Sequence, residues 1–400
     1  MPFDSGSITF RRFAVIGNKQ PKTFDQDHID LLANFAIKEK DIQTTPEEVE
    51  YGWSAGRHIL DADFSFDNNV FADCLHFALR IDTNKFPGEL RKAYQLMEED
   101  AAARKNPSGF ISKMQKRDAK DVVSRKIEDE LRAGHFRRSK LVSLLWDSST
   151  STVLSPATGK SFEYLAELFE RTFDLTLQPL SSGSLALRIL EPKGKRRDYE
   201  DVKPTRFVPS QQSEAEYPEY PWVLKGPEPK DFLGNEFLLW LWSESEGKHA
   251  GAIQTEAVGE ITLMIDRSLD LDCAYGQSGK DSLKGTAPSK FPEARDALRT
   301  GKLPRKAGML LDVHNQQYAF TFNPESFTLN STKLPDVEEA ETPRVLFEER
   351  ITLLRDLCQS MDALFETFLK VRASSAWESQ TGNIRRWIHQ APKQALTAVA

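Results

Sequence analysis

The sequence has few cysteines and no long apolar run. Its 400 residues include only Cys74, Cys273 and Cys358, which stand far apart with no partner at the spacing of metal ligands. Because this odd trio offers neither a disulfide framework nor a zinc motif, we expect core residues in a reducing compartment. No run of about 18 apolar residues and no charged-then-apolar leader is present, so we expect no membrane contact and a cytoplasmic location.

Residue patterns of familiar catalytic sites are also scarce. The seven histidines form no helical metal-binding pair, and none neighbours a serine or cysteine nucleophile. We expect His76 to pack within a strand. Two pairs of carboxylates have the alternate spacing that places both on one strand face, namely Asp61 with Asp63 and Asp270 with Asp272. A Mg²⁺-dependent nuclease would use such a pair to hold its metal ion. That enzyme stays an alternative.

The segment "SPATGKS", residues 155–161, matches a phosphate-binding loop only in part. Its Gly-Lys-Ser lies between a predicted strand and a predicted helix, which is the context of such loops. However, Leu154 occupies the position where the loop needs a glycine for its tight turn. We therefore expect an ordinary helix cap here and no nucleotide or other cofactor, with a nucleotide site as the lesser alternative.

Positive charge, in contrast, is concentrated. The chain has a formal net charge of −7, yet residues 104–140 hold twelve Lys or Arg against five Asp or Glu, a local excess of +7. Residues 284–306 hold seven basic and two acidic residues, an excess of +5. Two basic segments within an acidic chain suit binding to a polyanion. A solvated helix face that carries Lys and Arg is the alternative.

Apolar periodicity predicts strands and helices in irregular alternation. The first half predicts a strand at 8–16, a helix at 24–40, a hairpin at 58–81 that turns at 67–69, a hairpin at 140–155, a helix at 160–173 and a short strand at 185–190. In the second half, strands at 260–276 and 307–322 are predicted, the latter with a turn at His314 and Asn315. "FLGNEFLLWLW" at 232–242 fits either a buried helix or a strand.

Two successive helices are predicted around the first basic segment. The first begins near Pro87, and the second spans residues 112–133 and ends at Gly134. In the first half of the second helix, Lys113, Arg117 and Lys120 form a basic face. In the second half, Val123, Ile127 and Leu131 form an apolar face that overlaps the basic one. We expect the later half to dock and the earlier half to project into solvent as a basic arm.

An apolar seam near the C-terminus predicts a long helix. Seven residues recur at spacings of 4, 3, 4, 3, 4 and 3, namely Phe347, Ile351, Leu354, Cys358, Met361, Phe365 and Phe368. We expect this helix to pack on the protein's own sheet, with contact to another molecule as the alternative.

The order of these elements is similar to that of the RdgC family, the recombination-associated DNA-binding proteins of bacteria. The resemblance runs from about Ile8 to Val371. It rests on "ITFRRFAVIG", "EYGW", "FALRIDTNKFPGELRKAYQ", "RAGHFRRSKLVSLLWDSSTSTVL" and "EARDALRTGKLPRKAGMLLDVHNQQYAFTFNPESFTLNSTKLP". This chain departs from the family in a Pro-rich insertion around 200–228, in "FLLWLW" and in a tail after Val371.

The resemblance implies an α+β fold, in which a horseshoe-shaped subunit has antiparallel sheets, a helical tip and a long C-terminal helix. The expected parts are a central body (1–86 and 137–190), a basic helical tip (87–136), a connection (191–229), a second α/β base unit (230–373) and a tail (374–400). Two subunits would close into a homodimeric ring around DNA, and Phe136 resembles the aromatic residue that plugs the partner subunit.

The resemblance also implies binding to duplex and single-stranded DNA without sequence preference or catalysis, nucleoid association, and an effect on a RecA-type recombinase. The expected phosphate contacts are Lys113, Lys116, Arg117, Lys120, Arg125, Lys126, Arg137 and Arg138, with Lys284, Lys302, Arg305 and Lys306 as a second set. The alternatives are a Mg²⁺-dependent exonuclease and a recombinase-interacting protein that does not bind DNA.

Overall fold

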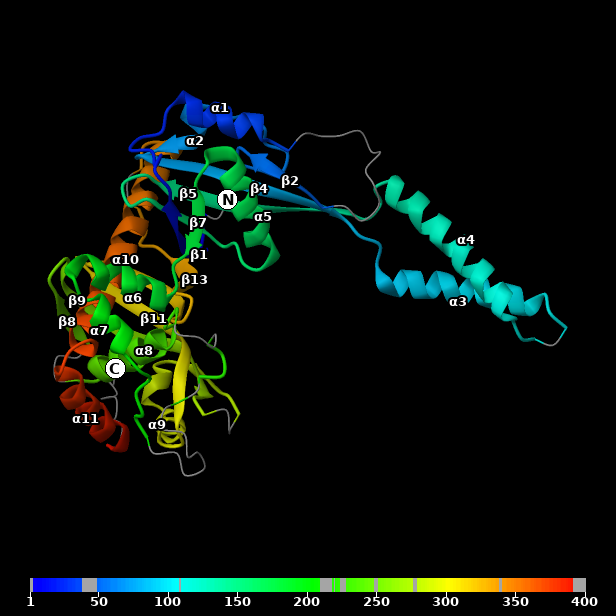
Figure 1. Cartoon of the computed structure of the whole chain (residues 1–400). Coiled ribbons are helices and arrows are strands. Elements are labelled where there is room, and N and C mark those ends of the chain that lie inside the picture. Colours follow the sequence, from blue (N-terminus) through cyan, green and yellow to red (C-terminus); the bar gives the residue numbers. More distant parts are fainter. Residues whose placement is uncertain are drawn as a thin grey trace, which may run out of the picture. The chain divides into compact units, whose positions relative to one another are not determined.

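The computed structural model describes residues 3–37, 49–107, 109–208, 218, 220–223, 228–247, 251–275, 279–337 and 340–390 (Figure 1). The chain forms two compact units. Unit 1 comprises residues 17–149 and 157–176, and unit 2 comprises residues 2–16, 150–156 and 177–400. Helices and antiparallel strands occur in both, so the predicted α+β class is confirmed. No helix within the described ranges is long and apolar enough to cross a membrane.

Unit 1 contains an antiparallel sheet in the order β2–β4–β5. Its elements are α1 (Gln26–Asn34), β2 (Val49–Ser54), α2 (Phe66–Asn69), β3 (Val70–Phe71), β4 (Cys74–Asn84), α3 (Gly88–Arg104), α4 (Lys113–Arg132), β5 (Arg137–Asp147) and α5 (Lys160–Phe173). Trp53 and Trp146 are fully buried between this sheet and α5. Trp53 Nε1 donates to Thr172 Oγ1, and the Trp146 ring lies 5.0 Å from that of Phe169. His76 is buried in β4, as predicted.

Gly52, of the "EYGW" segment, lies where two backbones approach closely. The neighbouring Trp53 accepts a hydrogen bond from Ile37 N and donates one to Phe35 O, so residues 35–37 run alongside β2. A Cβ at position 52 would lie 2.6 Å from Ile37 N. This contact requires glycine, because a side chain would push the two backbones apart.

The helix pair α3–α4 follows β4 and leads into β5. Ser112 caps α4 in a capping box with Gln115, and the chain turns at Gly134 after the C-cap. Val123, Ile127 and Leu131 are buried in a cluster with Phe86, against which Tyr94 and Phe136 pack. The two helices and the docking of the second half of α4 are therefore confirmed.

Unit 2 contains an antiparallel sheet in the order β10–β9–β11–β12–β13–β1–β6. Its strands are β1 (Ile8–Ile16), β6 (Thr152–Ser155), β7 (Thr176–Pro179), β8 (Ala252–Thr255), β9 (Gly259–Cys273), β10 (Asp281–Gly285), β11 (Lys302–Val313), β12 (Gln316–Asn323) and β13 (Thr328–Lys333). Its α-helices are α6 (Ser182–Leu190), α7 (Arg196–Asp201), α8 (Phe232–Ser245), α9 (Pro292–Arg299), α10 (Pro343–Arg372) and α11 (Ala376–His389). The turn at His314 and Asn315 is confirmed.

The long C-terminal helix α10 packs within its own chain. Six of the seven seam residues are buried, and Cys358 is half-buried. Phe365 and Phe368 lie 5.0 Å and 5.5 Å from the ring of Phe237 on α8. Since twelve of the fourteen α8 residues are buried, this helix forms the centre of the unit 2 core. The seam is therefore an internal contact, as expected.

Three local predictions are wrong. The helix predicted at 24–40 ends at Asn34, and Ala36 instead pairs with Trp53 of β2, while residues 38–40 lie outside the described residues. Residues 185–190 lie in helix α6, because Ser181 caps this segment and a six-residue apolar run fits a helix as well as a strand. In the 58–81 segment, residues 58–65 form no strand and residues 67–69 belong to α2, and the hairpin β3–β4 turns instead at Ala72 and Asp73. Both turn residues have positive φ, which Asp adopts more easily than most residues do.

Candidate nucleic-acid interface

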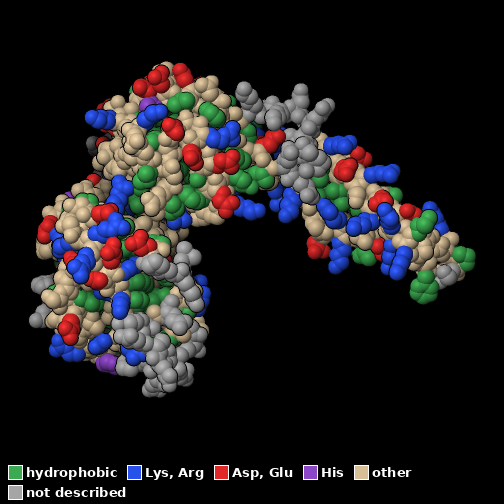
Figure 2. Space-filling view, in the orientation of Figure 1, with side chains coloured by type: hydrophobic (Ala, Val, Ile, Leu, Met, Phe, Trp, Pro, Cys, Tyr) green, Lys and Arg blue, Asp and Glu red, His purple; other side chains and the backbone are tan. Residues whose placement is uncertain are grey.

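The surface of α4 is strongly basic. All six cations predicted on this helix are exposed, namely Lys113, Lys116, Arg117, Lys120, Arg125 and Lys126. Among the described side chains, no carboxylate lies at ion-pair distance from the first five. Lys126 Nζ lies 4.1 Å from the centre of the Tyr94 ring. Lys and Arg side chains gather along the α3–α4 pair (Figure 2). These charges are therefore available to an anionic ligand.

The two arginines after α4 differ in their surroundings. Arg137 is half-buried, and its guanidinium donates to Asp82 at 2.7 Å, with Glu50 at 3.9 Å. Burial would raise the pKa of Asp82, but hydrogen bonds from Arg80, Ser139 and Arg137 outweigh it and hold that pKa below its usual value. Arg138 is exposed. Arg137 is thus engaged with the sheet, whereas Arg138 is open to solvent.

The second predicted set lies in unit 2 and is partly neutralised. Lys302 Nζ lies 2.6 Å from Asp281. Arg305 pairs with Glu325 at 3.0 Å and stacks over the Trp222 ring at 4.6 Å. Lys284 is exposed on β10, and Lys306 is half-buried beside an open cleft of about 340 Å³. The cations of α4 are therefore better placed to meet phosphate than this set is.

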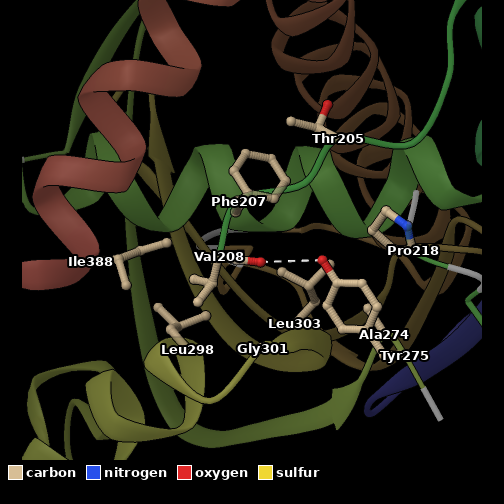
Figure 3. A pocket seen from close by; sticks show the side chains of 10 residues that line it. All are labelled: Thr205, Phe207, Val208, Pro218, Ala274, Tyr275, Leu298, Gly301, Leu303 and Ile388. Atoms are coloured by element: carbon tan, nitrogen blue, oxygen red, sulfur yellow. Dashed lines mark hydrogen bonds between the residues drawn. The ribbon is translucent and has the colours of Figure 1, made fainter. Parts of the chain in front are cut away.

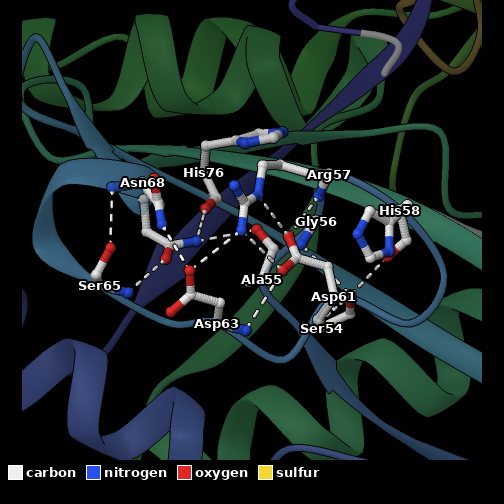
Figure 4. Close-up of polar contacts among 11 residues, drawn as sticks. Ser54, Ala55, Gly56, Arg57, His58, Asp61, Asp63, Ser65, Asn68 and His76 are labelled. Carbon is white, nitrogen blue, oxygen red and sulfur yellow. Dashed lines mark hydrogen bonds and ion pairs between the residues drawn. The ribbon is translucent and has the colours of Figure 1, made fainter.

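The carboxylates Asp61 and Asp63 are engaged by the loop that carries them (Figure 4). Asp61 is buried and accepts hydrogen bonds from Arg57 N and Nε and from Asp63 N. Burial would raise the pKa of Asp61, but the bonds from Arg57 outweigh this effect and lower it. Asp63 accepts from Asn68 and pairs with Arg57. These contacts give both carboxylates a structural role in holding the loop.

The second carboxylate pair has similar engagements. Asp270 accepts from Ser282 Oγ at 2.6 Å, and Asp272 lies 3.3 Å from Lys280 and 3.5 Å from Arg305. Within the described ranges, no cluster of three or more His, Cys, Asp or Glu side chains has the arrangement of a metal site. Neither pair therefore lends support to the nuclease alternative.

The segment "SPATGKS" forms a helix start. Gly159 is the residue before α5, and Thr158 N donates to Ser161 Oγ at 3.1 Å. The Ser161 hydroxyl in turn donates to Thr158 O. The segment thus begins an ordinary helix, as expected, but its N-cap residue, Gly159, makes no side-chain capping bond.

An apolar crevice in unit 2 is too small for a ligand (Figure 3). It encloses about 10 Å³ beside Phe207, Leu303 and Ile388, and Tyr275 Oη donates to Val208 O on its wall. A space of this size holds about one water molecule. It therefore belongs to the packing of unit 2.

Phe136 packs against its own chain. Its ring lies 4.7 Å from that of Phe86, within the cluster that joins α3 to α4. Phe136 is half-buried, so part of this residue stays exposed beside the cluster. Its role in dimer contact stays a prediction.

The helix pair carries a group of exposed apolar side chains that the residue patterns did not predict. Leu90, Leu96 and Met97 on α3 are 39%, 53% and 64% exposed, and α3 buries none of its residues. Phe110, in the turn between the helices, and Met114, in the first turn of α4, are 81% and 74% exposed. Their spacing in the sequence resembles that of core residues, and exposure becomes evident only in the folded pair.

No protein-family model matches the chain, and a search of curated proteins also finds no match.

Proposed function

We propose that this protein binds DNA without sequence preference, in the manner of the RdgC family that it resembles. The observation that carries the proposal is the row of exposed cations on α4, five of which have no described carboxylate at ion-pair distance. Such cations bind phosphates and release counterions, whatever the base sequence. Base-specific binding would require side chains placed in a groove to read base edges. The helix α4 offers mainly Lys and Arg, which suit backbone contact.

A homodimer that encircles DNA is the second part of the proposal. The resemblance implies two horseshoe-shaped subunits that close a ring through their helical tips. The exposed residues Leu90, Leu96 and Met97 support such a contact, since a second α3 would remove them from water. Helix α3 has three basic and four acidic residues, so two copies would repel each other little. By occupying DNA in the cytoplasmic nucleoid, the ring would restrain a RecA-type recombinase.

The DNA-binding proposal predicts equal affinity for unrelated duplexes and a steep loss of affinity with salt. With about five phosphate contacts, the slope of log K against log salt would be about −4.5. Fluorescence anisotropy with labelled duplexes at several salt concentrations measures both quantities. The DNA should remain full-length in the presence of Mg²⁺, and its degradation would favour the exonuclease alternative. No binding at low salt would contradict the proposal and favour a protein partner for the basic arm.

The dimer proposal predicts a single species of twice the chain mass, about 90 kDa from the chain's 45.4 kDa. Sedimentation velocity of the intact protein measures this mass. Changing Leu96→Glu together with Met97→Glu should shift the protein to monomers, because four charges would enter an apolar contact between two copies. A wild-type monomer at micromolar concentration would contradict the dimer but leave the DNA proposal standing.

A further inference from the structure

The turn between α3 and α4 presents an aromatic side chain to solvent, and the first turn of α4 presents a thioether. Phe110 and Met114 are the two most exposed large hydrophobic residues in the described part of the chain. Figure 2 shows hydrophobic side chains at this end of the helix pair, beside Lys and Arg. Exposing a phenyl ring to this extent gives up the free energy of burying it, so the position calls for a ligand that covers it.

The backbone around Phe110 is held in place by side chains. Asn106 Nδ2 donates to Phe110 O at 2.6 Å. The amides of Asn106 and Gln115 also exchange two hydrogen bonds, at 3.0 Å and 3.1 Å, and Gln115 completes the capping box with Ser112. The turn therefore carries Phe110 on an organised support, which lowers the entropy lost when a ligand stacks on the ring.

The charge around the turn selects the kind of ligand. Residues 104–117 include Arg104, Lys105, Lys113, Lys116 and Arg117, and no Asp or Glu. A second copy of the same surface would bring +5 against +5, which opposes self-association here, in contrast to α3. A ligand with a flat apolar face and flanking anions complements both the ring and the cations. Nucleobases between phosphates have this chemistry, and exposed aromatic rings beside Lys and Arg bind single strands in this way.

We propose that Phe110 stacks on an unpaired nucleobase of DNA, with Met114 beside it and the cations of residues 104–117 on the adjoining phosphates. This inference rests on the proposed DNA-binding function and adds a preference to it. Bases inside an intact duplex are already stacked on each other, whereas those of a single strand or a frayed end are accessible. The turn therefore favours single-stranded DNA and duplex ends, and the rest of α4 contacts the backbone of any DNA.

The experiment compares Phe110→Ala and Phe110→Trp with the wild type on two probes. One probe is a labelled 20-nucleotide oligo-dT, and the other is a 20-base-pair duplex closed by a loop at each end. We expect Phe110→Ala to weaken binding of the single strand by about tenfold and to leave the closed duplex within twofold. Phe110→Trp should restore single-strand affinity, because its larger ring stacks at least as well. Leu60→Ala, at another exposed apolar residue, is the matched control and should change neither affinity.

The outcomes separate this inference from the function on which it rests. If wild-type protein binds both probes and Phe110→Ala changes neither affinity, or lowers both equally, stacking at Phe110 is wrong and DNA binding stands. If Phe110→Ala instead converts a dimer to a monomer without changing affinity, the turn contacts a second copy and the inference is again overturned. If the wild type binds neither probe at low salt, the proposed function itself fails.

Discussion

Reversing three charges on α4, by Lys113→Glu, Arg117→Glu and Lys120→Glu, should weaken binding to every DNA sequence alike. All three side chains are exposed, and none has a described carboxylate at ion-pair distance. Losing three phosphate contacts should make the salt slope shallower by about 2.7 and lower affinity by about 1,000-fold at about 50 mM salt. Anisotropy titrations of the variant and the wild type on two unrelated duplexes, each at four salt concentrations, measure both effects.

A control variant must change the net charge equally at other positions. Lys22→Glu, Lys160→Glu and Lys333→Glu provide it, because these three lysines are exposed and lie outside both basic segments. Simple repulsion between DNA and a more acidic protein would weaken both variants alike. A contact made by α4 weakens only the first. An equal loss of DNA affinity in the two variants would contradict the assignment of α4 as the interface. So would an α4 variant that binds DNA as tightly as the wild type.

Local signals predicted the helix pair well. Pro87 before α3, Ser112 before α4 and Gly134 after it mark helix ends through their own backbone and side-chain chemistry, which needs no distant partner. The segment at 185–190 is too short to show a helical or a strand period, and the prediction overlooked its N-cap residue, Ser181. Sheet order was beyond reach, because strand alternation does not identify a partner. Phe10 on β1, for example, pairs with Leu329 on β13.

The candidate site was predictable in composition but not in detail. Counting charges located the cations of α4, since a helix whose one side packs must expose the other. The same count overstated how much of the positive charge in the second basic segment is available to an anionic ligand. Asp281 and Glu325, which pair with Lys302 and Arg305, lie on other segments of the unit and are brought close only by folding. The exposure of Phe110 also follows from the folded turn, where a Gly-Phe-Ile sequence would otherwise suggest a buried anchor.

A buried ion pair links α8 to the end of α10. Glu236 has no exposed surface and accepts hydrogen bonds from Arg372 Nε and from Thr205 N. Arg372 also donates to Lys203 O and lies 4.8 Å from the centre of the Trp377 ring. The pair thus connects the core helix, the long C-terminal helix and the segment before residue 209. Each charge is tolerated in the interior only because the other is present.

Replacing Arg372 by Met should lower the free energy of unfolding by about 3–5 kcal/mol, because the carboxylate of Glu236 would be left buried without its cation. Urea unfolding followed by tryptophan fluorescence measures this loss. Adding Glu236→Gln to the variant should recover a large part of it, since glutamine carries no charge and its carbonyl can still accept from Thr205 N. A single variant that loses less than about 1 kcal/mol would mean that water reaches Glu236. A double variant no more stable than the single one would place the contribution of Arg372 in its contacts with Lys203 and Trp377.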